Sequence, residues 1–258
     1  MPPLDLIRQR RSQRRDFRSE PVRRGDIDAL IEAARWAPSP FNIQPWELLF
    51  ITEPAQKAAL GELTRRHMSA QMKRRPFLEA AASWTRVTQE EWQEEGDGVY
   101  LGDQLPDSGF ARLVAPLLLK RPGAAAALAK LGAGSGPGNA AKRAVAEAPL
   151  LCVVFRRLDR VSPGANGDVW TLLSIGAMFQ NMLLEAEERG IGAQFAVAAL
   201  ETAKGRDETR LLLEAPETCE PILILRMGYL KKETEPILST RLPAERIAHF
   251  NRHGQKKP

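Results

Sequence analysis

A cluster of arginine side chains near the N-terminus contains the first residues that could do chemistry. Arg10, Arg11 and Arg14 surround Ser12, and the cluster begins inside a short helix predicted from Leu4 to Arg11. Guanidinium groups bind phosphate through paired hydrogen bonds, and a hydroxyl adds one more donor. These residue types and their spacing favour a phosphate-binding site, although a solvated basic face is the commoner role for any single arginine.

A proline-rich loop at residues 37–45 is the second candidate for binding. It contains three prolines and no glycine, so its backbone has little freedom. Three hydroxyl or amide side chains stand on it: Ser39, Asn42 and Gln44. A stiff loop of this kind can hold polar groups against a ligand. An ordinary connection between a helix and a strand is the alternative interpretation.

The sequence lacks the patterns of several common kinds of active site. It has no Gly-x-Ser-x-Gly elbow and no phosphate loop with Gly-Lys-Ser or Gly-Lys-Thr. The glycine-rich stretch at 132–138 follows an alanine-rich helix instead of a strand, which favours a hinge in a lid over a dinucleotide site. His67, His249 and His253 are too scattered for a metal site. Without a recognisable pair of nucleophile and base, a bound cofactor is the favoured source of chemistry.

Helices and strands around these motifs must position them, and hydrophobic periodicity predicts where they lie. An amphipathic helix at 27–36, with Asp26 as N-cap or first-turn acid, leads into the loop, and a strand at 46–51 leaves it, buried on both faces. A largely apolar helix at 169–189, ended by Gly190, is expected to be a central buried helix or a subunit interface. Further helices are expected at 55–72 and 201–213, and strands at 150–155, 191–197 and 221–229. A few strands separated by long helices predict an α+β sandwich.

Composition limits the class of protein. The chain has 258 residues, of which 43% are hydrophobic and 27% charged, so one large or two small folded domains are expected. The formal net charge of +5 suits an anionic ligand, a nucleotide cofactor or nucleic acid. Cys152 and Cys219 lie in apolar runs and are expected to be reduced core residues of a cytoplasmic protein. No apolar run approaches the ~20 residues of a membrane helix, so no membrane partner is expected.

The block at about 73–146 is the least regular part of the chain. Its aromatic residues are scattered through acidic and glycine-containing sequence, and alanine-rich segments follow. This pattern indicates an insertion that covers another part of the protein. Its aromatic side chains could reach a bound ligand or could pack a small core of the insertion itself: Trp84, Trp92, Tyr100 and Phe110.

Two N-terminal motifs together resemble the opening of the FMN-dependent nitroreductase family. The first is Arg10-Arg11-Ser12-Gln13-Arg14, and the second is Ala37-Pro38-Ser39-Pro40-Phe41-Asn42-Ile43-Gln44-Pro45-Trp46. The segment from Ser174 to Gly192 is similar to the family's central helix and its glycine exit, and Arg241-Leu242-Pro243 is similar to its C-terminal end. The resemblance covers roughly residues 4–60 and 145–250, and the N-terminal motifs are its more specific part.

The resemblance implies an α+β fold with a central, mostly antiparallel sheet flanked by helices, as a single domain with the lid-like insertion at about 73–146. It also implies an intertwined homodimer with FMN at each of two subunit interfaces. Arg10, Arg11 and Ser12 would hold the FMN phosphate. Arg241 would join them, and Arg14 would reach the pyrimidine edge of the flavin. The other implied contacts are Pro38, Ser39, Asn42 and Gln44 from the partner subunit, and backbone groups of Val197 and Ala198 near N5 and O4 of the flavin.

The activity implied by the resemblance is that of an FMN-dependent NAD(P)H oxidoreductase. NADH or NADPH would reduce the flavin and leave, and a nitroaromatic, a quinone or a related small-molecule acceptor would then take the reducing equivalents in a ping-pong order. The flavin would carry the chemistry, so no catalytic side chain and no metal are expected.

Three alternatives stay open. A lid-bearing, specialised dehydrogenase or reductase of the same family is the first, because members with specific substrates, including the iodotyrosine deiodinases, also carry lids. The second is a flavin-binding protein without turnover. The third is a basic nucleic-acid-binding protein, which would need aromatic residues among its arginines to stack on bases, and only Phe17 is near. We therefore expect no nucleic-acid partner.

Overall fold

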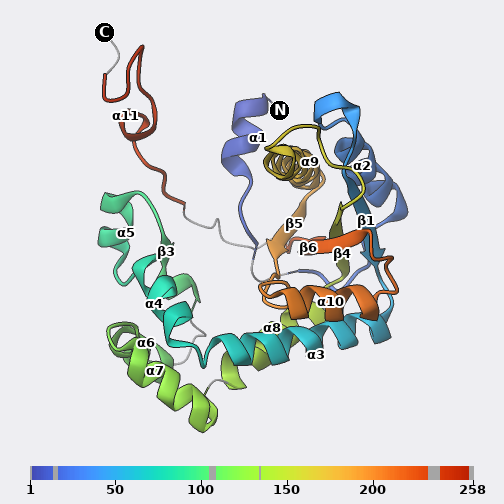
Figure 1. The fold of residues 1–258 in the computed structure, drawn as a ribbon. Helices are drawn as coiled ribbons and strands as arrows, with labels where there is room; N and C mark the ends of the chain where they lie inside the picture. Colours follow the sequence, from blue (N-terminus) through green and yellow to red (C-terminus); the bar gives the residue numbers. More distant parts are fainter. Residues whose placement is uncertain (1, 14–16, 105–108, 134, 232–238, 256–258) are drawn as a thin grey trace. The chain divides into compact units, whose positions relative to one another are not determined.

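A computed structural model describes residues 2–13, 17–104, 109–133, 135–231 and 239–255 of the chain (Figure 1). The chain divides into two compact units. The first contains Met1–Met68 and Gly136–Ile237, and the second contains Ser69–Ser135 and Leu238–Pro258. The predicted single domain with a lid-like insertion stays a prediction, although the second unit includes most of the block expected to form the lid.

A four-stranded sheet lies at the centre of the first unit. Its strands, in spatial order, are β1 (Trp46–Ile51), β4 (Leu150–Arg157), β6 (Cys219–Tyr229) and β5 (Ile191–Phe195). Every neighbouring pair of these strands is antiparallel. The predicted α+β class with a mostly antiparallel sheet is therefore confirmed.

Helices cover both faces of this sheet (Figure 1). One face carries α1 (Pro3–Gln9), α2 (Arg24–Arg35) and α9 (Gly167–Glu188), and the other carries α3 (Pro54–Gln71), α8 (Ser135–Ala146) and α10 (Ala203–Leu212). Strand β4 is buried from Leu150 to Phe155, and its alternate side chains enter two hydrophobic clusters. Leu150 and Cys152 join the cluster that contains Met178 of α9, whereas Leu151 joins the cluster that contains Leu60 of α3. The continuous apolar run of β4 is thus explained by burial on both faces.

Strand β1 differs from the predicted burial on both faces. It lies at the edge of the sheet, and Leu48, Leu49 and Phe50 are only partly buried. An edge strand has a hydrogen-bonded neighbour on one side only, so its side chains are covered less completely than those of a central strand. An apolar run therefore does not distinguish a central strand from an edge strand in this chain.

Both cysteines are core residues, as predicted. Cys152 and Cys219 are buried free thiols. Burial raises the pKa of each thiol above its ordinary value. Because the thiolate is the reactive form, neither side chain is suited to be a nucleophile.

Helix α9 is buried along one side only. Its inner side chains, including Met178 and Met182, are fully buried, but its N-terminal part exposes a contiguous set of large apolar residues: Val169, Trp170, Leu172 and Leu173. The helix ends at Glu188, with Arg189 as its C-cap, and Gly190, the predicted end, follows with a φ of 66° that is costly for other residues. Helix α9 is largely apolar, yet no helix in the described part of the chain is both long and apolar enough to cross a membrane.

The second unit consists of short elements. Its helices are α4 (Arg75–Ser83), α5 (Gln89–Glu95), α6 (Gly109–Leu119), α7 (Pro122–Leu128) and α11 (Ala244–Ile247), and its strands are β2 (Thr85–Arg86) and β3 (Val99–Tyr100), which pair in parallel. The buried Trp92 stacks on Tyr100 with ring centroids 6.2 Å apart, so this pair packs a small core of its own unit. Trp84 is exposed. The side chain of Phe110 is not among those that the structure describes.

The glycine-rich stretch at 132–138 is more helical than the sequence predicted. A π-helical turn spans Ala129–Ala133, and α8 begins at Ser135 with Gly136 and Gly138 inside it. Gly138 is buried, so packing on the first unit favours a helix that local propensity disfavours. One boundary between the two units falls between Ser135 and Gly136, and the hinge expected in this stretch stays a prediction.

A buried carboxylate ties together three elements at one end of the first unit. Asp26, in the first turn of α2, accepts hydrogen bonds from the hydroxyl of Tyr229 at the end of β6, from Arg23 at 2.9 Å and from Arg189 at 2.8 Å. Its prediction as a first-turn acid is confirmed, and Arg23 is the N-cap. The hydrogen bonds from Tyr229 and Arg189 hold the pKa of Asp26 at about 2.

Replacing Asp26 by asparagine should lower the free energy of unfolding by about 2–3 kcal/mol, because charged hydrogen bonds to a buried group are lost. The pKa of Asp26 is lower in the folded protein than in the unfolded chain, so its contribution is complete above about pH 4 and is lost as the pH falls towards 2. Urea unfolding of both proteins between about pH 7 and pH 3 measures this difference. Asp28→Asn removes an exposed ion pair with Arg24 and should change stability by at most ~0.5 kcal/mol. Equal losses in the two variants would contradict the role of Asp26.

Candidate functional site

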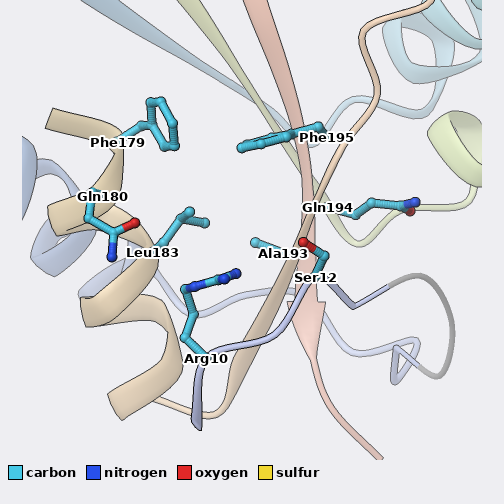
Figure 2. A pocket seen from close by; sticks show the side chains of 8 residues that line it. All are labelled: Arg10, Ser12, Phe179, Gln180, Leu183, Ala193, Gln194 and Phe195. Carbon is cyan, nitrogen blue, oxygen red and sulfur yellow. The ribbon is translucent and has the colours of Figure 1, made fainter. Parts of the chain in front are cut away.

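A pocket of about 230 Å³ lies between α9 and β5 in the first unit (Figure 2). Three groups of residues line it: Arg10 and Ser12 from the segment after α1, Phe179, Gln180 and Leu183 from α9, and Ala193, Gln194 and Phe195 from β5. The structure therefore brings two members of the predicted phosphate cluster to one cavity. Both come from the end of a short helix and the turn that follows it.

The segment after α1 is held against the free edge of β5. Ser12 forms a parallel bridge with Ala193, and the amide of Gln13 donates a hydrogen bond of 2.9 Å to the carbonyl of Ala193. Gly192 permits this close approach, since a Cβ there would lie 2.9 Å from Cβ of Gln13 and 2.4 Å from Cδ2 of Leu230. The position of Ser12 in the pocket thus depends on a glycine about 180 residues further along the chain.

The pocket has a cationic end and an aromatic end (Figure 2). Arg10 and Ser12 supply hydrogen-bond donors at one end. At the other end Phe179 and Phe195 meet edge to face, with ring centroids 5.5 Å apart. Leu183 lies between the two ends on the α9 side. This arrangement suits a ligand with an anionic group joined to a flat apolar body.

Arg11 lies beside this pocket but does not line it. Its guanidinium Nη1 donates to the carbonyl oxygens of Arg8 and Arg10, the latter at 3.0 Å. It therefore caps carbonyl groups at the end of α1. Arg14 lies outside the described residues, so its predicted role at the flavin pyrimidine stays a prediction.

The proline-rich loop lies far from this pocket within one protomer. It leads into β1, at the opposite edge of the sheet from β5. Trp46 pairs with Arg156 of β4. Ala193 pairs with Met227 of β6, which in turn pairs with Leu150 of β4. The path from Leu150 to Arg156 along the strand is roughly 20 Å, and three strand spacings are roughly 14 Å, so the two corners are roughly 25 Å apart.

Pro38, Ser39, Asn42 and Gln44 therefore do not meet Arg10 within one chain. The loop that holds them has a strained backbone. Phe41, Asn42 and Gln44 all have positive φ, between 45° and 53°, which costs free energy in residues other than glycine and is typical of ligand-binding sites. Hydrogen bonds hold this conformation: Oγ of Ser39 accepts from the amide of Gln44 at 3.0 Å, and Nε2 of Gln44 donates to Oδ1 of Asn42 at 3.0 Å.

Val197 and Ala198 lie just beyond the aromatic end of the pocket, in the loop after β5. The carbonyl of Val197 accepts a hydrogen bond of 2.7 Å from the amide of Leu200, and Ala198 is buried. Arg241 belongs to the second unit, where its guanidinium donates to the carbonyl of Thr240 at 2.6 Å and to the hydroxyl of Ser239. Its role at the phosphate stays a prediction.

Sequence reasoning did not single out most of the pocket's walls as site residues: Phe179, Gln180, Leu183, Ala193, Gln194 and Phe195. Gln180 offered one signal, because it is a polar residue on a helix that is apolar through most of its length. The aromatic residues offered none, since apolar side chains in a helix or strand usually belong to the core. No group of three or more His, Cys, Asp or Glu side chains within the described ranges could hold a metal ion.

Comparison with known proteins adds evidence of common origin. The model of the nitroreductase family matches residues 7–229. A stretch of 115 residues is 30% identical to an NADPH-flavin oxidoreductase of Vibrio harveyi, over 43% of this chain and 46% of that protein. A stretch of 53 residues is 47% identical to an NADH dehydrogenase of Thermus thermophilus, over 20% of this chain and 25% of that protein. The matched stretches thus span less than half of either relative.

Solved structures share the fold over nearly the whole chain. The NADPH:FMN oxidoreductase of Vibrio harveyi in complex with NAD+ has a TM-score of 0.59 and 15% identity, over 98% of this chain and 79% of that one. An iodotyrosine deiodinase bound to FMN and 3-iodo-L-tyrosine has a TM-score of 0.55 and 20% identity, over 93% of this chain and 96% of that one. At these identities the likeness concerns the fold alone.

Proposed function

The chain belongs to the nitroreductase family, and we propose that it is an FMN-dependent NAD(P)H oxidoreductase that passes reducing equivalents to nitroaromatic, quinone or related acceptors. The observation that carries this proposal is the pocket with Arg10 and Ser12 at one end and facing aromatic rings at the other. Guanidinium and hydroxyl donors suit the phosphate of FMN, and apolar walls suit the rest of a flavin nucleotide. The residues present therefore fit the cofactor.

We propose further that the working form is a homodimer with FMN at each interface. The pocket of about 230 Å³ is smaller than the 300–1,000 Å³ typical of sites for ligands of this size, so one protomer supplies an incomplete site. The proline-rich loop carries the polar side chains that the site needs, yet it lies at the opposite corner of its own sheet. A second copy of the chain can bring that loop to the pocket. The exposed apolar residues of α9 supply a surface for such a contact.

The side chains act by binding and orienting in this mechanism. FMN held in this site would supply the hydride chemistry that links NADH or NADPH to the acceptor. Arg10, Arg11 and Ser12 would hold its phosphate, and Arg241 would assist. Arg14 would supply positive charge at the pyrimidine edge of the flavin. The partner's loop closes the opposite side, so that nicotinamide and acceptor occupy the same dry face in turn, in ping-pong order.

The test is flavin binding followed by reduction. Purified protein loaded with FMN is expected to bleach under anaerobic NADH or NADPH and to recover its colour when a quinone or a nitroaromatic is added. A protein that takes up no FMN would contradict the proposal. Flavin that binds but is reduced by neither nicotinamide would favour a flavin-binding protein without turnover. Running both donors against a panel of acceptors would also determine donor preference.

A specialised, lid-bearing reductase of the same family is the second candidate. The second unit favours it, since Ser69–Ser135 belong to a separate compact unit, together with Leu238–Pro258, that exposes Trp84. The fold shared with an iodotyrosine deiodinase makes a halogenated aromatic a reasonable member of the acceptor panel. Turnover confined to one acceptor would support this candidate. For either candidate we propose a cytoplasmic location and neither nucleic acid nor membrane as a partner.

A further inference from the structure

Glu187 occupies an unusual place for a carboxylate, beside the cationic end of the pocket. On α9 the residues Gln180, Leu183 and Glu187 are spaced three and then four apart, so they share one face of the helix. Gln180 and Leu183 line the pocket, and Glu187 continues their row by one turn towards the end of α9. The side chain of Glu187 is half-buried.

Among the described residues of the chain, Arg10 and Arg11 are the charged groups that act on Glu187. Burial raises the pKa of Glu187, and the positive charges of Arg10 and Arg11 oppose that rise. Arg10 is the C-cap of α1 and Arg11 follows it, and α1 packs against α9. On α9 itself, Glu188 and Arg189 are exposed, and Arg189 is engaged by Glu185 and Asp26. Within the described residues, Glu187 is therefore coupled to the same two guanidinium groups that would hold the FMN phosphate.

Binding of a phosphate changes the net charge around Arg10, Arg11 and Glu187. Arg10 and Arg11 bring two positive charges, and a phosphate monoester brings about −1.5 to −2 at neutral pH. The arginines and the phosphate nearly balance each other. An ionised Glu187 would leave about one negative charge in excess in a half-buried place, where like charges raise the pKa of a carboxyl group. Protonation of Glu187 removes that excess.

We propose that Glu187 sets the affinity for the phosphate end of the flavin: its carboxylate neutralises Arg10 and Arg11 in the free protein and takes up a proton when FMN binds. The inference rests on the proposed function, because it assigns the phosphate to these two arginines. The proton comes from solvent and adds to a carboxylate oxygen, and no other bond forms or breaks. FMN affinity is then highest below the pKa of Glu187 in the free protein. It falls as the pH rises between that pKa and the higher pKa in the complex, and it is constant above both.

The test compares two ligands and two variants. Titrating flavin-free protein with FMN and with riboflavin, by quenching of flavin fluorescence between about pH 5 and pH 8.5, separates the phosphate contribution, since riboflavin lacks it. We expect Glu187→Gln to bind FMN about ten-fold more tightly than the natural protein at pH 8, with a flatter pH profile. Riboflavin affinity should change less than about two-fold. Glu188→Gln, at the exposed neighbouring position, should leave both affinities unchanged.

Several outcomes would overturn the inference. Weaker FMN binding by Glu187→Gln would mean that the carboxylate orients the arginines instead of competing with the phosphate. Equal effects on FMN and riboflavin, or equal effects of the Glu187 and Glu188 variants, would place Glu187 outside the phosphate site. If the natural protein bound neither flavin, the proposed function itself would fail. That result is distinct from FMN binding that is insensitive to Glu187.

Discussion

Replacing Arg10 by alanine weakens FMN binding by about 1.5–3 kcal/mol, which is roughly a 10- to 150-fold increase in Kd. Arg10 is the described guanidinium that lines the pocket, and a charged hydrogen bond to phosphate is among the stronger contacts a side chain makes. Isothermal or fluorescence titration of the flavin-free variant measures the change. Arg8→Ala is the matched control, because Arg8 is an exposed arginine of the same helix that does not line the pocket.

A double variant that carries both Arg10→Ala and Arg241→Ala extends this experiment to the second unit. If the C-terminal segment also reaches the phosphate, the two substitutions together should cost roughly 2–5 kcal/mol, with incomplete additivity because both groups act on one ligand. An Arg241→Ala variant that binds FMN normally would remove the C-terminal segment from the site. Unchanged affinity in Arg10→Ala, or a loss as large in Arg8→Ala, would remove the N-terminal cluster and with it the main support for the proposed cofactor.

Replacing Leu172 and Leu173 by glutamate should convert the protein to a monomer that binds FMN poorly. These side chains are 49% and 59% exposed in the single chain, an unfavourable position for two leucines unless another surface covers them. In a two-fold interface each substitution occurs twice. Loss of apolar burial alone would cost roughly 6 kcal/mol or more, at about 1.5–3 kcal/mol per side chain, before the cost of burying charge is counted.

Sedimentation velocity and flavin titration on the same samples provide the measurement. Leu211→Glu is the control, since Leu211 is 60% exposed on α10 and belongs to a different surface. Circular dichroism should be native for both variants, because the substituted side chains are exposed. A variant that stays dimeric, or a monomer that binds FMN as well as the natural protein, would contradict the shared site. FMN should also promote dimer formation, because a ligand bound across an interface favours the assembled state.

Some elements of the fold could be predicted from local pattern. The strand at 46–51 has its predicted bounds, and α2, β4 and α9 lie within a few residues of theirs. A run or stripe of apolar side chains specifies strand or helix through neighbours close in sequence, so a single chain contains that information. The presence of Arg10 and Ser12 in the pocket was also predictable, because guanidinium and hydroxyl groups at a helix end are chemically suited to phosphate.

Other elements could not be predicted, because long-range packing decided them. Helix α8 contains two glycines, and glycine costs about 1 kcal/mol relative to alanine in a helix. It forms against α3, where Gly61 leaves room: a Cβ there would lie 2.9 Å from the carbonyl of Lys142. The incomplete burial of Leu48 to Phe50 likewise depends on β1 being an edge strand, which its own sequence does not encode.

The sequence by itself determined which residues of this protein could bind a phosphate, because that property belongs to the side chains and their neighbours. Only the tertiary structure decided where they lie. It placed Ser12 beside Ala193 and brought the rings of Phe179 and Phe195 together edge to face. It also placed the proline-rich loop at the opposite corner of the sheet. The order of strands in a sheet depends on the packing of the whole chain, which no local pattern records. The same packing brought a half-buried carboxylate to the arginines, and Glu187 carried no motif by which the sequence could reveal it.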